Sequence, residues 1–324
     1  MRRWDLIGHR RYLYLASLLI VLLAGAALAG NALSGRPPLN WGVDFTGGTL
    51  LLLRFEDRTV TTGKVRSVLA PLRLGEAVIQ QTPGTADISI RTRPLSVAER
   101  NRVLGALRNA MGPFTVLSVD DVGPKIGREL RNIAILGVAI GLALQVVYVT
   151  LRFRSWHYAL AADVALVHDV LVVLGAFALT RATVDSAFVA VLLTVVGYSI
   201  NDTIVVFDRI RENLNLRARE PFPELVNRSV LESLVRSLGT SITTLLAIGA
   251  VYVFGGPTIR DFAFGLCVAV LTGAYSSIGV ASPLLVDLTT RAERRALVAA
   301  TAPSGPQSEV VEAGSRRRRR TSRV

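Results

Sequence analysis

The sequence predicts a polytopic α-helical membrane protein with six transmembrane helices and one folded domain outside the membrane. The 324-residue chain is 51% hydrophobic and only 19% charged, which is too apolar for an ordinary soluble enzyme. Apolar stretches long enough to cross a hydrocarbon core of ~30 Å as a helix lie at about 12–33, 131–151, 157–180, 186–207, 232–254 and 261–286.

The distribution of arginines predicts the orientation of the six spans. The N-terminal segment, the turn that contains Arg152 and Arg154, the loop from Arg209 to Arg228 and the tail from Arg291 are basic, and they alternate with loops that carry little charge. Because basic loops stay inside, we expect both termini to be cytoplasmic.

This orientation divides the chain into four regions: 1–33 with the first span, an external domain at 34–130, the remaining spans at 131–290 and a basic tail at 291–324. The tail is rich in Ala, Ser, Pro and Gly and contains Arg316–Arg320. This composition predicts a disordered segment that is attracted to anionic lipid.

The external region predicts a ferredoxin-like α+β domain. Strands are expected at 49–55, 77–81, 87–91 and 114–119, a helix at 62–72, and a second helix after a capping box formed by Ser96 and Glu99. The order strand, helix, strand, strand, helix, strand is that of a ferredoxin-like unit. Such a domain either grips an extended chain at its sheet edge or only docks a partner.

A glycine-rich motif connects the first span to this domain. Gly42, Asp44, Gly47 and Gly48 lie within Gly-Val-Asp-Phe-Thr-Gly-Gly, where Gly47 and Gly48 are free to adopt positive φ angles. The motif predicts a tight corner, and we expect it to act as a hinge.

Asp202 is the principal candidate functional residue, because it lies inside the fourth apolar stretch. An ionisable group at membrane depth costs about 2.5 to 3.5 kcal/mol, so it usually faces a bundle interior or a water path. Arg236 lies at a comparable depth on the next, antiparallel span, and we expect the two residues to pair. The pair is either a switch that protonation opens or a static salt bridge.

Further polar residues lie in the third and fourth spans. His168 and Asp169 are interpreted mainly as hydrogen-bonding residues in helix packing, with a proton relay as the alternative. Ser199 and Asn201, beside Asp202, are further candidates for a proton path.

Four motifs together resemble the SecF subunits of the SecD/SecF family. They are the motif at 42–48, His168-Asp169, the stretch Gly197–Asn213, and Phe254-Gly255-Gly256-Pro257. The resemblance implies six spans that form half of an RND-type transporter in the bacterial inner membrane.

In this family the two halves use the proton-motive force to draw preproteins outward, with an aspartate and an arginine at the positions of Asp202 and Arg236 conducting protons. The implied partners are a SecD-like subunit, the SecYEG channel, the translocating preprotein and, as a further candidate, YajC, with no nucleic acid. The proton is the coupling ion and no cofactor is expected.

Alternative interpretations are half of a proton-driven RND small-molecule exporter and a non-transporting scaffold. An enzyme is not expected, since the sequence has no Walker phosphate loop, zinc-protease motif or nucleophile elbow.

Overall fold

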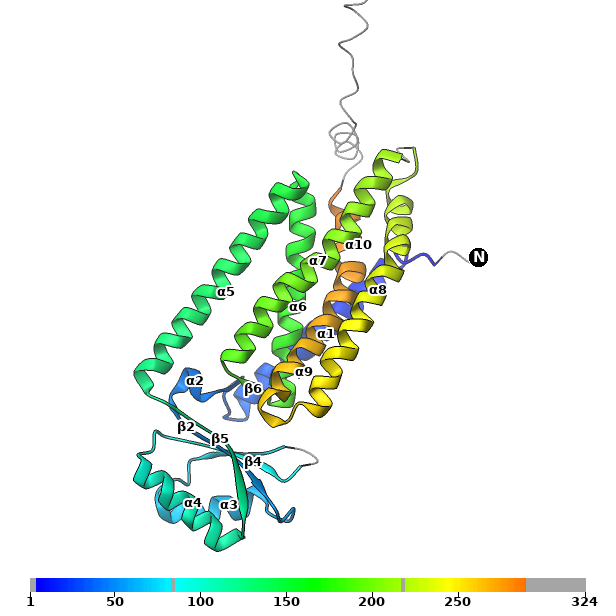
Figure 1. The fold of residues 1–324 in the computed structure, drawn as a ribbon. Helices are drawn as coiled ribbons and strands as arrows, with labels where there is room; N and C mark the ends of the chain where they lie inside the picture. The colour runs from blue at the N-terminus through cyan, green and yellow to red at the C-terminus, as the bar shows by residue number, and fades with distance from the viewer. Residues whose placement is uncertain (1–3, 83–84, 217–218, 290–324) are drawn as a thin grey trace, which may run out of the picture.

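The computed structural model describes residues 4–82, 85–216 and 219–289, and it contains the predicted helical bundle with one α/β domain at one end (Figure 1). The basic tail and its predicted contact with lipid fall outside these residues. The prediction of six spans is confirmed, because six helices are long and apolar enough to cross a membrane. They are α1 Arg10–Leu33, α5 Pro124–Phe153, α6 Trp156–Thr180, α7 Ser186–Leu216, α8 Phe222–Phe254, and α9 Pro257–Ser276 with its continuation to Leu288.

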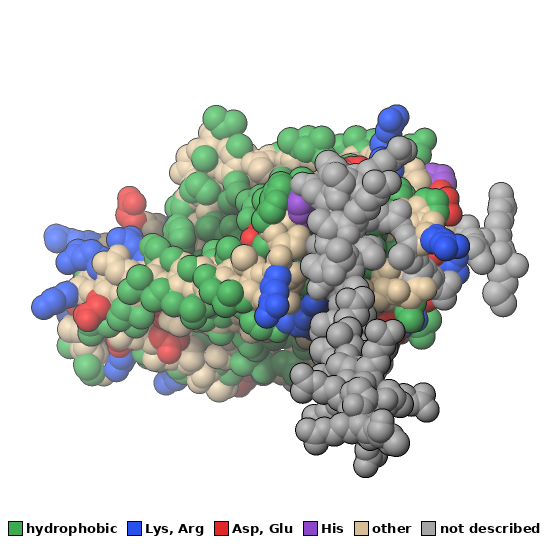
Figure 2. Space-filling model, turned by 90° about the horizontal axis from the view of Figure 1, so that it is seen from above, with side chains coloured by type: hydrophobic (Ala, Val, Ile, Leu, Met, Phe, Trp, Pro, Cys, Tyr) green, Lys and Arg blue, Asp and Glu red, His purple; other side chains and the backbone are tan. Residues whose placement is uncertain are grey.

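Three helices form the centre of the bundle and three lie at its periphery. Buried residues make up 50%, 44% and 56% of the most apolar stretches of α6, α7 and α9 with its continuation, but only 11%, 6% and 11% of those of α1, α5 and α8. Viewed from above, the molecule shows broad areas of hydrophobic side chains interrupted by small groups of charged ones (Figure 2). Such a surface suits lipid or a second bundle better than water.

The α/β domain has the predicted ferredoxin-like topology. Its sheet has the order β3-β4-β2-β5 with all pairs antiparallel. The predicted capping box of Ser96 and Glu99 is present at the start of α4. The elements are β2 Gly48–Phe55, α3 Thr62–Leu69, a 3₁₀ turn at Ala70–Leu72, β3 Val78–Gln81, β4 Asp87–Thr92, α4 Val97–Met111 and β5 Phe114–Val122.

Every second side chain of β2 points into the core of this domain. Leu51, Leu53 and Phe55 are buried and belong to one apolar cluster with residues of α3 and α4. Since successive strand residues point to opposite faces, the two helices cover one face of the sheet, as Figure 1 shows. The opposite face is turned toward the bundle.

A short parallel ladder joins the domain to the bundle. Strand β1, Asn40–Trp41, pairs with β6, Thr183–Val184, in the connection between α6 and α7. Arg91 of β4 donates to the Asn40 side chain at 3.0 Å and to the Trp41 carbonyl. Burial lowers the pKa of Arg91. The α/β domain is therefore held against the end of the bundle by polar contacts.

Candidate functional site

Asp202 lies in the interior of the bundle, where α7 meets α8. Its side chain is 7% exposed, and Ser237 of α8 donates a hydrogen bond of 2.5 Å to its Oδ1 atom. The second oxygen, Oδ2, is buried and has no hydrogen-bond partner among the residues that the structure describes. Buried polar atoms are normally satisfied, so this oxygen, near the hydroxyl of Ser277, is open to a further donor such as water.

The expected ion pair between Asp202 and Arg236 does not form in the described part of the chain. Arg236 is exposed, while its neighbour Ser237 is buried against Asp202. Neighbouring residues on a helix point about 100° apart, so a helix that presents Ser237 to α7 turns Arg236 away. Similar depth along two spans does not determine which face of its helix a residue occupies.

Asp169 of α6 has a different environment from Asp202. Its carboxylate is fully buried and accepts hydrogen bonds from Ser199 of α7 at 2.5 Å and from Thr272 and Ser276 of α9 at 2.7 and 2.6 Å. The Nδ1 atom of His168 lies 3.0 Å from it. Asp169 therefore ties the three central helices together, which fits the packing role expected from the sequence.

A π-helical turn supplies further hydroxyl groups to this network. It spans Ser277–Ala281, between α9 and α10 Ser282–Leu288. Ser276 reaches Asp169 from the turn before it, while the Ser277 hydroxyl lies 3.0 Å from that of Thr203 on α7. Isolated π turns in helices are frequent at functional sites. This turn was not predicted, and its only signal in the sequence is the run of small residues there.

A row of exposed polar groups lies beside Asp202 on the bundle surface. Asn201 of α7 and Arg236, Thr240 and Thr243 of α8 are exposed, although their helices are apolar enough to span a membrane. We call these four residues the polar row. The Thr240 and Thr243 hydroxyls donate to carbonyls of their own helix. Charged and polar residues in membrane segments usually face a protein interior or a water-filled cavity, so Arg236 and Asn201 favour a cover over the polar row.

The glycine motif forms the predicted tight corner, and neighbouring backbone packs closely around it. Gly47 and Gly48 adopt φ angles of +74° and +129°. A Cβ atom on Gly48 would lie 2.3 Å from the Thr92 carbonyl oxygen, and one on Gly42 would lie 2.9 Å from Asp185. Only glycine fits positions of this kind without strain.

Asp44 fastens the same motif to the start of α7. Its carboxylate accepts a 2.9 Å hydrogen bond from the Ser186 backbone N–H and a second one from the Ser186 hydroxyl. A carboxylate is stabilised at a helix N-terminus by the free N–H groups and the helix dipole. The motif therefore connects the α/β domain directly to the helix that carries Asp202.

Two family models match the chain. "Protein export membrane protein SecD/SecF, C-terminal" matches residues 103–291, and "SecD/SecF GG Motif" matches residues 33–57. The second match covers the glycine motif, and the first covers the five membrane-length helices that follow the α/β domain.

Individual relatives agree with these matches. The protein translocase subunit SecF of Acidaminococcus fermentans is 37% identical over 91% of this chain and 100% of its own length. That of Pseudomonas aeruginosa is 39% identical over 79% of this chain and 83% of its own. The protein translocase subunit SecDF of Thermus thermophilus is 40% identical over 89% of this chain, which spans only 39% of that relative.

The fold also matches solved structures. The crystal structure of SecDF from Thermus superimposes with a TM-score of 0.79 at 40% identity, over 88% of this chain and 38% of that one. A SecDF crystal structure in a super-membrane-facing form gives a TM-score of 0.64. The chain therefore belongs to the SecD/SecF family of protein-export membrane proteins and corresponds to its SecF subunits.

Proposed function

We propose that this chain is the SecF half of a protein-export complex and that Asp202 carries the protons that drive it. The observation that supports this most directly is the environment of Asp202. It is a buried carboxylate with one free oxygen, and it lies next to a polar surface at membrane depth. One charge that crosses the membrane potential releases about 2.3 kcal/mol per 100 mV, so a few protons supply enough free energy to bias a conformational switch.

The partner is a SecD-like half that covers the polar row. The chain spans only 39% of the SecDF relative from Thermus, which leaves room there for a second bundle. In the parallel repeats of transporters, sites form at the interface between two such halves. Arg236, which points away from its own bundle, is then placed to interact with groups of the partner and with water at the same interface.

We orient the chain with the α/β domain outside, and with the beginning of the first helix and the end of the last helix in the cytoplasm. Arg152 and Arg154 lie at the end of α5 and Arg209 in the last third of α7, and both helices run away from the domain. The excess of positive charge belongs inside. The domain then acts on the preprotein that leaves the SecYEG channel, the glycine motif transmits movement between domain and bundle, and YajC is a further partner. The chain is a transport component and not an enzyme.

The experiment compares Asp202→Asn with a matched control, Asp208→Asn, on the same helix. Asparagine keeps the acceptor for Ser237 but carries no proton, whereas Asp208 forms an exposed ion pair with Arg152 at 2.8 Å. In vesicles that contain the complete complex, Asp202→Asn should abolish the part of export that depends on membrane potential, and Asp208→Asn should keep it. We expect Arg236→Met to behave like Asp202→Asn.

Abundance and binding to the SecD-like half, measured by immunoblotting and co-purification, separate this proposal from a scaffold. A scaffold loses assembly when its intramembrane charges are removed, whereas a proton carrier keeps assembly and loses transport. Potential-dependent export by assembled Asp202→Asn would refute the proton role. The single small α/β domain argues against a small-molecule exporter, which needs larger outside domains to form a pocket.

A further inference from the structure

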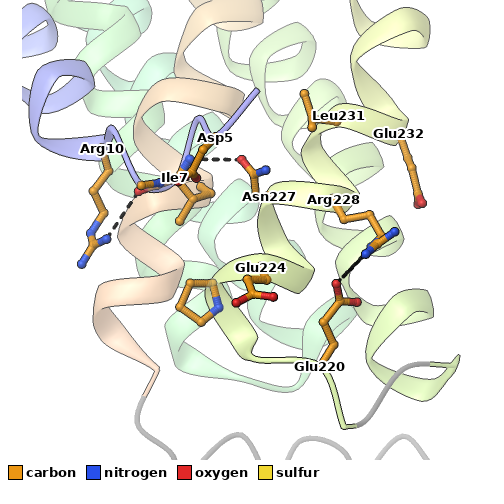
Figure 3. A pocket seen from close by; sticks show the side chains of 11 residues that line it. Asp5, Ile7, Arg10, Glu220, Glu224, Asn227, Arg228, Leu231 and Glu232 are labelled. Carbon is orange, nitrogen blue, oxygen red and sulfur yellow. Dashed lines mark hydrogen bonds and ion pairs between the residues drawn. The ribbon is translucent and has the colours of Figure 1, made fainter. Parts of the chain in front are cut away.

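An open pocket of about 550 Å³ lies at the end of the bundle opposite the α/β domain. The segment before α1 forms one wall, and the beginning of α8 forms the other (Figure 3). Asn227 of α8 fixes the first wall, because its side chain accepts from the backbone N–H groups of Leu6 and Ile7 at 2.8 and 3.2 Å and donates to the Trp4 carbonyl at 2.9 Å. The pocket is therefore built by specific contacts.

The lining of this pocket carries an excess of negative charge. Four carboxylates (Asp5, Glu220, Glu224 and Glu232) face two arginines, Arg10 and Arg228. Both arginines already bind carboxylates: Arg228 binds Glu220 at 2.8 Å, and Arg10 binds Asp287, outside the pocket lining, at 2.9 Å. Glu232 binds Arg209 of α7 at 2.7 Å, so the attraction for a further cation comes mainly from Asp5 and Glu224. Glu224 is exposed in the first turn of α8 and forms no ion pair with another described residue.

The lining also offers apolar contacts to the stem of a long basic side chain. Pro223 and Leu231 contribute hydrocarbon surface to the pocket. Arginine side chains bury their methylene groups against such surface and keep the guanidinium in contact with carboxylates and water. The pocket therefore suits an arginine-rich peptide better than a compact inorganic cation.

This chain contains such a peptide, and it is tethered at the edge of the pocket. Residues 290–324 include nine arginines and three glutamates, with five consecutive arginines at Arg316–Arg320. They follow directly on α10, whose Asp287 binds the pocket residue Arg10. The number of residues between Thr289 and Arg318 corresponds to a root-mean-square span of about 30 Å for a random coil, and tethering at such a distance gives millimolar effective concentrations.

We propose that the pocket between the N-terminal segment and α8 binds the arginine run Arg316–Arg320 of the same chain. Docking there holds the tail against the cytoplasmic end of the bundle and keeps the arginine run away from the anionic lipid surface. The N-terminal segment, α8 and the tail then form one cytoplasmic unit. This inference is independent of the proton role of Asp202.

Site-specific photo-crosslinking tests the proposal in the full-length chain. A photoreactive p-benzoylphenylalanine replaces Arg318, and the protein is placed in nanodiscs that each hold one copy, made either of phosphatidylcholine or of phosphatidylglycerol. Mass spectrometry then identifies the crosslinked segment. We expect crosslinks to residues 5–10 and 220–232 in both lipids, with a yield that falls at high salt because the attraction is electrostatic.

The double variant Asp5→Asn/Glu224→Gln removes two of the attracting charges. Exposed ion pairs change an equilibrium constant by roughly 1.4- to 5-fold each, so docking should weaken roughly 2- to 25-fold. The control Asp208→Asn removes a carboxylate of α7 that pairs with Arg152 and does not line the pocket, and it should leave the yield unchanged. Crosslinks to lipid alone, crosslinks to another part of the bundle, or a yield that the double variant does not reduce would each overturn the proposal.

Discussion

Asp169 and Asp202 are both buried aspartates of the bundle, and their contacts predict that removing Asp169 lowers the stability of the bundle much more than removing Asp202. Asp169→Ala removes a carboxylate that receives three hydroxyl donors and lies 3.0 Å from His168. Hydrogen bonds between membrane helices contribute about 0.6 kcal/mol each on average, so the loss is about 2 kcal/mol before any cavity term. Asp202→Ala removes one hydrogen bond, from Ser237, and should cost about 0.6 kcal/mol.

The measurement is reversible unfolding of the purified variants in mixed micelles, with the SDS fraction as denaturant. Asp169→Ala should shift the midpoint several times further than Asp202→Ala. The conservative variant Ser199→Ala, which removes a single donor to Asp169, should match Asp202→Ala. If Asp202→Ala destabilised the bundle as much as Asp169→Ala, the assignment of one carboxylate to packing and the other to proton transfer would be wrong.

Two predictions concern the α/β domain. Gly48→Val forces a Cβ to within 2.3 Å of the Thr92 carbonyl oxygen at a φ of +129°, so it should lower stability by about 1–3 kcal/mol, expose the junction to limited proteolysis and slow export. The control Gly105→Val, in α4, meets nothing within 4 Å and should do none of these. Hydrogen bonds from Arg93 and Ser96 lower the pKa of Glu99 to about 2. Because folding lowers this pKa, the ionised Glu99 carboxylate adds to the free energy of unfolding above the unfolded pKa, and this contribution is lost as pH falls through about 2. Arg93→Ala should move the pKa of Glu99, measured by NMR titration, toward its ordinary value. An unmoved midpoint would show that Arg93 does not cause the low pKa.

The fold was predictable from the sequence because its signals are local. The spans follow from composition, and the ferredoxin-like order follows from alternation and from the capping box at Ser96. The pairing of β1 with β6 was not predictable, since each strand has two residues and the partners are more than 140 positions apart. Strands of that length carry no periodic signal, and only the assembled bundle brings them together.

The candidate site was predictable in part for the same reason. Asp202 was found because a carboxylate in an apolar run stands out in composition. Its partner was predicted as Arg236 and is Ser237 in the structure, because the choice between neighbouring residues depends on the rotation of α8 about its axis. That rotation is set by packing between helices, which a single sequence does not record. The role of Ser276 and the π turn after it depend on the same packing.

The contacts of α7 suggest which boundary in the bundle responds to a proton. On one side, Ser199 and Thr203 hold α7 to α6 and α9 through Asp169 and Ser277. On the other side, Asp202 meets α8, a peripheral helix, through one hydroxyl donor. A change in the charge of Asp202 therefore acts first on its contact with α8, a boundary that is also held by Asn213 with Ser229 and by Arg209 with Glu232, nearer the end of the bundle opposite the α/β domain. Because the polar row lies on these same two helices, a movement of α8 is transmitted directly to whatever covers that row.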